Sequence, residues 1–499
     1  MVRPAVRAIL IAASVLMLAD LRAADPAGPS APPPLSLEQS VAQALARNFN
    51  VRIQQYPIDQ AKAAVIIAQS TYDPVLGVSW QSLAEKSPNL EASGAATTVL
   101  PYENDQTAGL SATENVITGG QVTANYNVGR DYTNPIATFI NPAYEGNISL
   151  NISQPLLQGA GTDYARAAID IARYGEKLQD LNFKSVVLTL IYNVETAYYT
   201  LIFTRQQYEV AKDAVTLAQQ LLDENNIKRK TGVLTDLDVV QAEAQLATAQ
   251  SQLIGYRQTM ENAEDVLLQA LGEREFRTGV GPVAFPPLPD TSNISFFVSY
   301  KLARDNGPSL AIVQATIDQY KLAALRAKRN NLPQLTLNGG AGYNTLKGSY
   351  YTAATNAWDG PGYNWQAGLA LNFPWGLRSS KAQYREAMDN IEAEQVALDQ
   401  ADQNLMVQVR AAVRGVQANV EAVDAASSAS ALSQKQYELQ KARFDAGLAI
   451  SYDVVLAQNQ LETARVAELQ ARVNLRIAIA DLRMLEGTSL DAYHVNLKY

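Results

Sequence analysis

Few residues of this 499-residue chain could carry out covalent chemistry. The chain has no cysteine and one histidine, His494, close to its end. Disulfides, thiolate metal sites, a cysteine nucleophile and a cysteine-linked lipid anchor are therefore excluded, and a histidine-based metal site or triad lacks ligands. Carboxylates are plentiful, but no pattern brings a pair of them into a cleft. We therefore expect neither an enzyme nor a bound cofactor or metal, although a hydrolase using paired carboxylates stays a minor alternative.

Two carboxylates occupy equivalent places in the chain. Asp238 and Asp453 each follow a glycine, Gly232 and Gly447, by six residues. Each aspartate falls in the first turn of a predicted helix, where a negative charge complements the helix dipole and, with Thr235 at the N-cap, takes part in capping. The alternative is that symmetry brings copies of these carboxylates together as a ring that attracts cations.

Charge and the N-terminus indicate where the chain works. A net charge of −9 repels nucleic acid, so no nucleic-acid partner is expected. Residues 1–24 carry Arg3 and Arg7, an apolar run over 8–19 and small residues near their end, which is the layout of a secretory signal peptide. A linker over 25–35 follows. A spanning anchor is the alternative, but the run is shorter than the roughly 20 residues that a spanning helix needs. No other apolar run looks long enough, so membrane insertion must use β-strands or a surface contact.

The chain contains two copies of one pattern. GVLTDLDVVQAEAQLATA, from Gly232, aligns without gaps on GLAISYDVVLAQNQLETA, from Gly447, with nine identities in eighteen positions. The first copy runs over about 36–272 and the second over about 296–487. A proline-bearing linker over 273–295 joins them, and a tail over 488–499 follows.

Long coiled-coil helices dominate each copy. Apolar residues recur at spacings of three and four, a sustained 3.5-residue seam, after Gly232 and again after Gly447. Helices are predicted over about 163–271 in the first copy and about 380–486 in the second. The first helix of each pair is proline-free for some 65 residues, near 100 Å at ~1.5 Å per residue. Such lengths indicate elongated columns rather than a globular core.

Between the helices the period changes from 3.5 to 2. Strands are predicted within about 74–155 and about 333–374, with apolar residues alternating with Asn, Ser and Thr. That pattern is typical of a strand with lipid on one side and water on the other, and a soluble β-sandwich is the alternative. All the tryptophans fall here and are candidate interfacial aromatics: Trp80, Trp358, Trp365 and Trp375. The first region is about forty residues longer and holds a probable extra hairpin, turning near Gly119.

Helix, strand, long helix and helix units, duplicated after a signal peptide, resemble the outer-membrane efflux protein family, the TolC-like trimeric channel-tunnels. The motifs that carry the resemblance are SQPLLQGAG over 153–161, its degenerate partner NFPWGL over 372–377, and the tip motifs KTGVLTDLDVV and DAGLAISYDVV. The resemblance implies an α+β membrane protein with internal duplication: a trimeric outer-membrane β-barrel on a periplasmic α-barrel built from the coiled-coil helices.

The family implies a function and partners. We expect a homotrimer in outer-membrane lipid that docks to a periplasmic adaptor (membrane fusion) protein and an inner-membrane pump. It would be a passive duct in a tripartite efflux or type I secretion system. The alternative is a coiled-coil structural or adhesive protein of the periplasm or cell surface. Four strands per chain would close a twelve-stranded barrel, and the extra hairpin either widens the wall to eighteen strands or projects outside the cell.

The helix tips are the candidate periplasmic gate, formed by Gly232, Gly447, Asp238 and Asp453. This sequence departs from the family pattern at three further positions. Leu456 stands where relatives often carry a second acid, Ala449 where some carry Arg, and Phe444 is an aromatic without a hydroxyl. We therefore expect a gate that is more apolar and less hydrogen-bonded than in those relatives.

Overall fold

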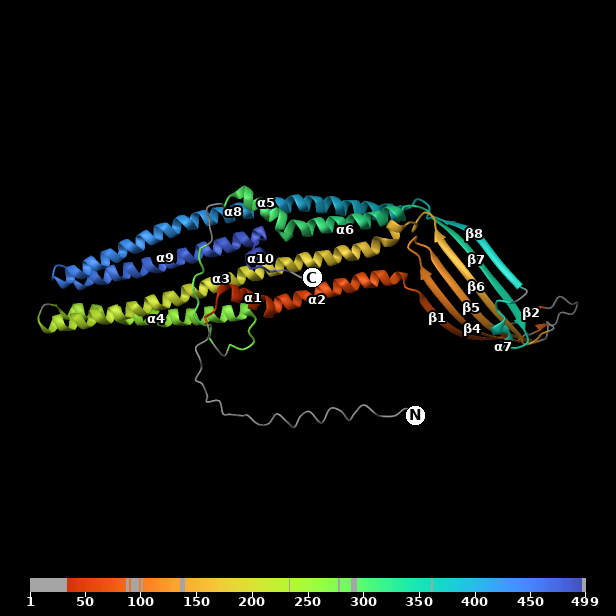
Figure 1. Ribbon diagram of the computed structural model, residues 1–499, viewed down its shortest axis with the longest axis horizontal. Coiled ribbons are helices and arrows are strands. Elements are labelled where there is room, and N and C mark those ends of the chain that lie inside the picture. Colours follow the sequence, from red (N-terminus) through yellow and green to blue (C-terminus); the bar gives the residue numbers. More distant parts are fainter. Residues whose placement is uncertain are drawn as a thin grey trace, which may run out of the picture.

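The computed structural model describes residues 34–86, 89–90, 98–99, 102–134, 140–232, 234–276, 279–288, 294–359 and 362–495. The predicted signal peptide and most of the N-terminal linker lie outside the described residues. The chain is an elongated body of long helices that carries a β-sheet at one end (Figure 1).

Helices of very different lengths build each copy. The first copy contributes α1 (Leu37–Arg47), α2 (Phe49–Gln69), the short 3-10 helix η1 (Ser70–Tyr72), α3 (Thr162–Lys230) and α4 (Asp236–Leu271). The second contributes α5 (Phe296–Asn306), α6 (Pro308–Asn330), α8 (Arg378–Asp445) and α9 (Ser451–Glu486). The short α10 (Ser489–Ala492) follows. Helices α3 and α8 have 69 and 68 residues, and each forms one unbroken column of about 100 Å.

The predicted seams are the contact lines between these helices. Helix α4 packs along α3, and α9 packs along α8, while α3 also contacts α9 and so joins the two copies (Figure 1). Seam residues such as Val239, Ala242, Leu461 and Leu475 are buried. Toward the sheet, α2 and α6 replace α4 and α9 as the partners of α3 and α8. Each copy therefore has one continuous column and one broken column, as the lengths predicted.

The main core lies around the middle of α3. One 18-residue window of α3 is long and apolar enough, by length and composition, to cross a membrane. The expectation that no further apolar run reaches this length is therefore wrong. These side chains lie inside the helical body: Val187, Ile191, Val194, Tyr198 and Leu201 are at most 1% exposed. The apolar stretch serves packing against α1, α4 and the linker.

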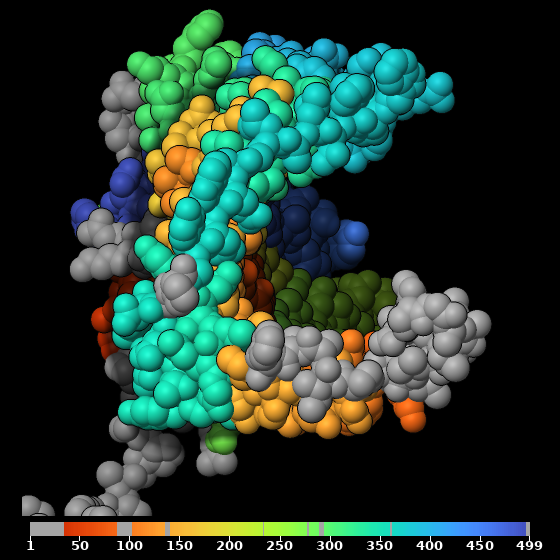
Figure 2. Space-filling model, turned by 90° about the vertical axis from the view of Figure 1, so that its right-hand side faces the viewer, coloured from red at the N-terminus to blue at the C-terminus, as the bar shows by residue number. Residues whose placement is uncertain are grey.

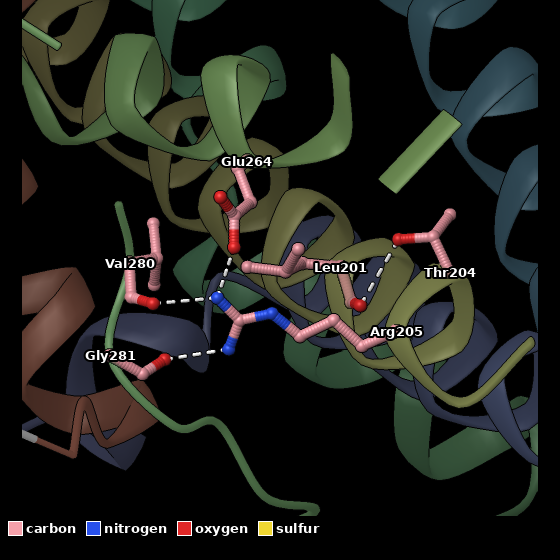
Figure 3. Close-up of polar contacts among 6 residues, drawn as sticks. All are labelled: Leu201, Thr204, Arg205, Glu264, Val280 and Gly281. Carbon is pink, nitrogen blue, oxygen red and sulfur yellow. Dashed lines mark hydrogen bonds and ion pairs between the residues drawn. The ribbon is translucent and has the colours of Figure 1, made fainter. Parts of the chain in front are cut away.

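Arg205 fastens the linker between the copies to the helices (Figure 3). Its guanidinium donates hydrogen bonds of 2.6 Å to the carbonyls of Val280 and Gly281, and it forms an ion pair with Glu264 of α4. Nearby, the Tyr198 hydroxyl donates to the carbonyls of Leu35 and Ala284. The linker residues 279–288 and the start of the described chain are thus held against α3, so the link is ordered by polar contacts as well as by its prolines.

Six strands form one antiparallel sheet in the order β1-β4-β5-β6-β7-β8. The strands are β1 (Val75–Lys86), β4 (Tyr102–Asn115), β5 (Gln121–Asn134), β6 (Ala143–Pro155), β7 (Gln334–Lys347) and β8 (Gly362–Asn372). Strands β2 (Asn89–Leu90) and β3 (Thr98–Val99) pair separately. Helix α7 (Tyr350–Thr355) lies between β7 and β8.

The extra hairpin of the first copy widens the sheet. It is formed by β4 and β5, which insert between β1 and β6 and pair along their full lengths. The turn between them is near the helices: Gly119 has φ +88°, and the Gly161 N–H donates to the Thr118 carbonyl at 3.1 Å. The hairpin therefore spans the height of the sheet rather than projecting from its far end.

Candidate functional site: the two-faced sheet and the helix tips

The sheet has one apolar and one polar face, and the strand register defines them. Each register row places residues of one face side by side, as in Val78, Leu110, Tyr126, Ile148 and Tyr343. The neighbouring apolar row contains Leu76, Leu150 and Trp365. Positions between these rows carry Ser, Thr, Asn, Gln and Gly. Because side chains alternate along a strand, the two chemistries lie on opposite sides of the sheet.

The apolar face is the more exposed of the two. Val78 is 84% exposed, Leu76 79% and Trp365 73%. Ser111, Asn127 and Asn151 on the polar face are half-buried. The polar side chains also bond across strands, as in Ser153 with Asn338 at 3.0 Å. On a curved sheet, side chains of the concave face converge and shield one another, whereas those of the convex face diverge. The lower exposure of the polar side chains therefore indicates that the polar face is concave. Seen from the strand end, the chain forms an open arc (Figure 2).

This arrangement is the reverse of a soluble sheet. A β-sandwich buries its apolar face against another layer, and α7 alone covers part of this face within the described residues. An outward apolar band and an inward polar surface are the features of a membrane barrel wall. The β-sandwich alternative is therefore rejected.

The four candidate interfacial tryptophans lie at different heights of the sheet. Trp80 is on the apolar face of β1, midway along the strand, and Trp358 follows α7 at the outer end of the sheet. Trp365 is on the apolar face of β8, and Trp375 follows β8 where the chain enters α8. All four are at least 70% exposed, as residues in contact with lipid headgroups would be.

The helix tips at the far end are built on glycine turns. Gly232 and Gly447 have φ of +77° and +73° and end α3 and α8, a conformation that glycine adopts without strain. The N–H of Leu448 donates to the Arg443 carbonyl at 2.8 Å, which closes the second turn. Each turn sends the chain back along its partner helix, so both tips lie at the same end of the molecule (Figure 1).

Asp238 and Asp453 occupy the same place in the two tips but differ in bonding. The Asp238 carboxylate accepts bonds from the Thr235 N–H at 2.9 Å and from its hydroxyl at 2.6 Å. Within the described residues, the Asp453 carboxylate accepts only the Ile450 N–H, at 3.4 Å, because isoleucine has no hydroxyl. Asp238 is thus firmly engaged at the start of α4, and Asp453 is more loosely held. Among the described residues, no group of three or more acids or histidines is placed to hold a metal ion.

Phe444 has a polar partner that sequence reasoning missed. Its ring is 3% exposed and packs with Leu221 and Val454. The Lys228 ammonium lies 3.5 Å from the ring centroid and also donates to the Phe444 carbonyl at 3.4 Å. A cation–π contact therefore engages this aromatic ring, although the ring carries no hydroxyl. Leu456 is 45% exposed, in line with an apolar tip surface.

A second missed contact joins the copies directly. Asn225 of α3 is fully buried and donates to the Ser451 hydroxyl of α9 at 2.9 Å and to the Asp238 carbonyl at 3.1 Å. Ser451 is 1% exposed. A serine at the start of a helix is usually explained by local capping. Nothing in the sequence therefore indicates that Ser451 bonds to Asn225 of another helix.

Comparison with known proteins agrees with this geometry. The outer membrane efflux protein family matches residues 41–273 and 299–488, one match on each copy. The chain is 24% identical to the toxin and drug export protein A of Aggregatibacter actinomycetemcomitans over 61% of this chain and 65% of that protein. It is 22% identical to the outer membrane protein TolC of Escherichia coli over 64% and 66%. The chain thus spans just under two thirds of these relatives.

A solved structure of similar fold is the CmeC outer membrane channel of Campylobacter jejuni, with a TM-score of 0.68, 19% identity and coverage of 90% of this chain and 85% of that one. The fold is the α+β, internally duplicated channel-tunnel fold. The two-faced sheet marks the part that lies in the outer membrane, and the long helices extend into the periplasm. The chain belongs to the outer membrane efflux protein family.

Proposed function

We propose that three copies of this chain form a passive export duct across the outer membrane, which works with a periplasmic adaptor and an inner-membrane pump. The observation that carries the proposal is the sheet whose polar face is concave and whose apolar face is exposed. A lipid-facing wall whose inner surface is lined by Asn, Ser, Thr and Gln is typical of a water-filled channel.

The unpaired edges of the sheet support closure by further copies. Among the described residues, β1 pairs only with β4 and β8 only with β7, so both edges carry free backbone groups. In lipid, each unsatisfied group costs several kcal/mol. Strand β1 runs away from the helices and β8 runs toward them, so β8 of one copy fits antiparallel beside β1 of the next. Cyclic repetition then removes every edge.

The helices support the same closure. Helices α2 and α4 form one side of the chain, and α8 forms the other, with α3, α6 and α9 between them. These sides continue the edges β1 and β8, because β1 follows α2 and α8 follows β8. One rotation can thus close the sheet and the helical columns together. Three copies, as in the channel-tunnels that the chain resembles, would make an 18-stranded barrel from six strands each.

The natural absence of cysteine allows a direct test. Ser79→Cys on the polar face of β1 is combined in turn with Asn364→Cys, Gln366→Cys and Gly368→Cys on the polar face of β8. At least one pair should give a covalent trimer on oxidation in outer membranes, and purified trimers should conduct in planar bilayers. The matched control combines Ser79→Cys with Trp365→Cys, which lies on the opposite face and should not cross-link. A monomer without conductance would instead favour the structural or adhesive alternative.

A further inference from the structure

The apolar face of the sheet ends in a row of different chemistry. One register row of this face holds Trp80, Ala108, Val128, Gly146 and Thr345, and it lies close to the outer end of β6 and β7. Two residues further along each strand, the register sets Gln106, Arg130, Tyr144 and Lys347 side by side on the same face. This set is called the basic row below. Arg130 and Lys347 are separated by one strand, β6, so their backbones are about 10 Å apart.

Charges at this end are sorted by face. The carboxylates of the outer strand ends lie on the concave face: Glu85, Glu103, Asp105, Asp131 and Glu145. The bases lie on the convex face: Lys86, Arg130 and Lys347. The sheet itself separates the two sets. In the described part of the chain neither Arg130 nor Lys347 has an ion-pair partner; Arg130 lies 5.5 Å from the Tyr132 ring centroid and donates to Asn104 at 3.4 Å. Ion pairing among the described residues therefore does not explain Arg130 and Lys347.

On β7, the basic row begins where the apolar face ends. From Leu335, near the helices, to Thr345 the apolar face of β7 covers ten residue steps. At about 3.4 Å per residue and a tilt of about 40°, this is roughly 26 Å of height, close to the ~25 Å apolar band of outer-membrane barrels. Lys347 and Arg130 lie one row beyond it. This places Lys347 at the headgroups of the outer leaflet, and Arg130 is its neighbour in the same register row, two strands away.

Helix α7 gives the basic row a fixed neighbour. It lies on the same face, because a side chain at Gly146 would collide with the Ala353 carbonyl and Tyr126 donates to the Ala354 carbonyl at 2.8 Å. The Tyr350 ring packs edge-on against Tyr144 at 4.6 Å, and its hydroxyl donates to Gln106 at 3.3 Å. Two members of the basic row are therefore held by α7. Tyr351 of α7 and Trp358, just after the helix, are 77% and 70% exposed, as interfacial anchors are.

We propose that the basic row binds the phosphate groups of anionic glycolipids in the outer leaflet. Arg130 offers a planar fork of donors that matches phosphate, and Lys347 offers a point charge. The two bases flank Tyr144 on the neighbouring strands, and the ring and hydroxyl of Tyr144 suit the border between acyl chains and headgroups. The inference rests on outer-membrane localisation and strand direction and does not depend on the number of copies.

Native mass spectrometry of the delipidated, detergent-purified protein tests this. The probe is bis-phosphorylated lipid A, compared with the same lipid after removal of its phosphates. The double variant Arg130→Gln, Lys347→Gln should weaken binding of the phosphorylated lipid at least tenfold and leave the dephosphorylated lipid unaffected. The control variant Arg378→Gln, Lys381→Gln removes the same charge at the start of α8, beyond the other end of the sheet, and should change binding less than twofold.

The proposal would be overturned by equal loss in both double variants, by no loss in either, or by equal binding of the two lipids by the parent. Competition by inorganic phosphate at millimolar concentration without any preference for the lipid would also do so, since it would indicate a free-anion site. Arg130→Lys with native Lys347 keeps the charge and controls for folding. It should bind the phosphorylated lipid more tightly than Arg130→Gln, and equal weakening in the two single variants would mean that the charge is not what binds.

Discussion

The side-chain amide of Asn225 donates a 2.9 Å hydrogen bond to the hydroxyl of Ser451, which ties α3 of the first copy to α9 of the second near the helix tips. Both residues are buried, and the Asn225 amide oxygen has no partner in the described part of the chain. Removing one member of such a pair leaves the other as a buried polar group with one hydrogen bond fewer, which lowers the stability of the folded state. We therefore expect this pair to stabilise the packing of α3 against α9 at the helix tips, the candidate gate.

The first prediction concerns this pair. Ser451→Ala leaves a buried amide donor with one bond fewer and should destabilise the tips by about 1 to 3 kcal/mol. Basal conductance in planar bilayers should rise. Asn225→Ala should also raise it, and the double variant should show coupling of at least about 0.5 kcal/mol. Gln245→Ala is the control, because Gln245 makes a similar 2.7 Å bond to Asn459 between the copies but in an exposed position. A leak in the control as large as that in Ser451→Ala would contradict the prediction.

The two tip aspartates should behave differently. Asp238→Ala removes two bonds at the start of α4 and should cost about 0.5 to 2 kcal/mol, which raises the basal leak. In the part of the chain that the structure describes, the Asp453 carboxylate makes a single long bond, so Asp453→Ala should leave the leak nearly unchanged. If copies of Asp453 line the closed mouth, a divalent cation added from the periplasmic side blocks conductance and Asp453→Ala weakens that block. We expect a weak block even in the parent, because Leu456 replaces a second acid. If Asp453→Ala leaves the block unchanged, Asp453 does not bind the cation, and its role is limited to complementing the helix dipole in the first turn of α9.

Equivalent seam positions should differ in sensitivity. Leu461 is 3% exposed, whereas its counterpart Leu246 is only partly buried. Leu461→Asp places an unpaired carboxylate in the core and should cost about 3 to 5 kcal/mol, while Leu246→Asp should cost about 1 kcal/mol. The yield of heat-resistant trimers should fall sharply for the first and moderately for the second. Equal losses would mean that another copy covers Leu246.

The inserted hairpin should be removable. Deletion of residues 87–134 removes β4 and β5 and leaves β1 and β6 antiparallel to each other. Leu76 of β1 and Leu150 of β6 lie in one register row, so the two strands can pair with their apolar faces on the same side. We expect a folded trimer with two strands fewer per chain, since barrel diameter grows with strand number. Electron cryomicroscopy should count 18 strands in the parent and 12 in the deletion. A parent barrel of 12 strands would show that the hairpin leaves the wall on assembly.

Glu195 should make stability depend on pH. It is 2% exposed, and burial raises the pKa of its carboxyl, an effect that the Tyr493 hydrogen bond and the Arg483 charge partly oppose. Because the folded-state pKa is above the unfolded one, its stabilising contribution is present at acid pH and is lost as pH rises through the folded value. Glu195→Gln should therefore raise the melting temperature at neutral pH and flatten its pH dependence. Tyr493→Phe is the comparison, since it strands the carboxylate and should lower the melting temperature at neutral pH.

Much of the architecture follows from the sequence because it depends on local periodicity. Seams of 3.5 residues, the absence of proline over some 65 residues and strict alternation in the strands determine the long helices, the two-faced strands and the duplication. The glycine turns at Gly232 and Gly447 were equally visible, since positive φ there requires glycine.

Tertiary structure decided what depends on partners distant in sequence. Alternation shows that Arg130 and Lys347 share a face with apolar neighbours, but only the register sets them in one row. The destination of the extra hairpin also depends on pairing between strands, because the same two strands could project or insert. Lys228 over Phe444, and Asn225 beside Ser451, meet only because α3 and α8–α9 lie side by side. Such contacts join residues more than 200 positions apart, and a periodic pattern carries no information on which helix will face which.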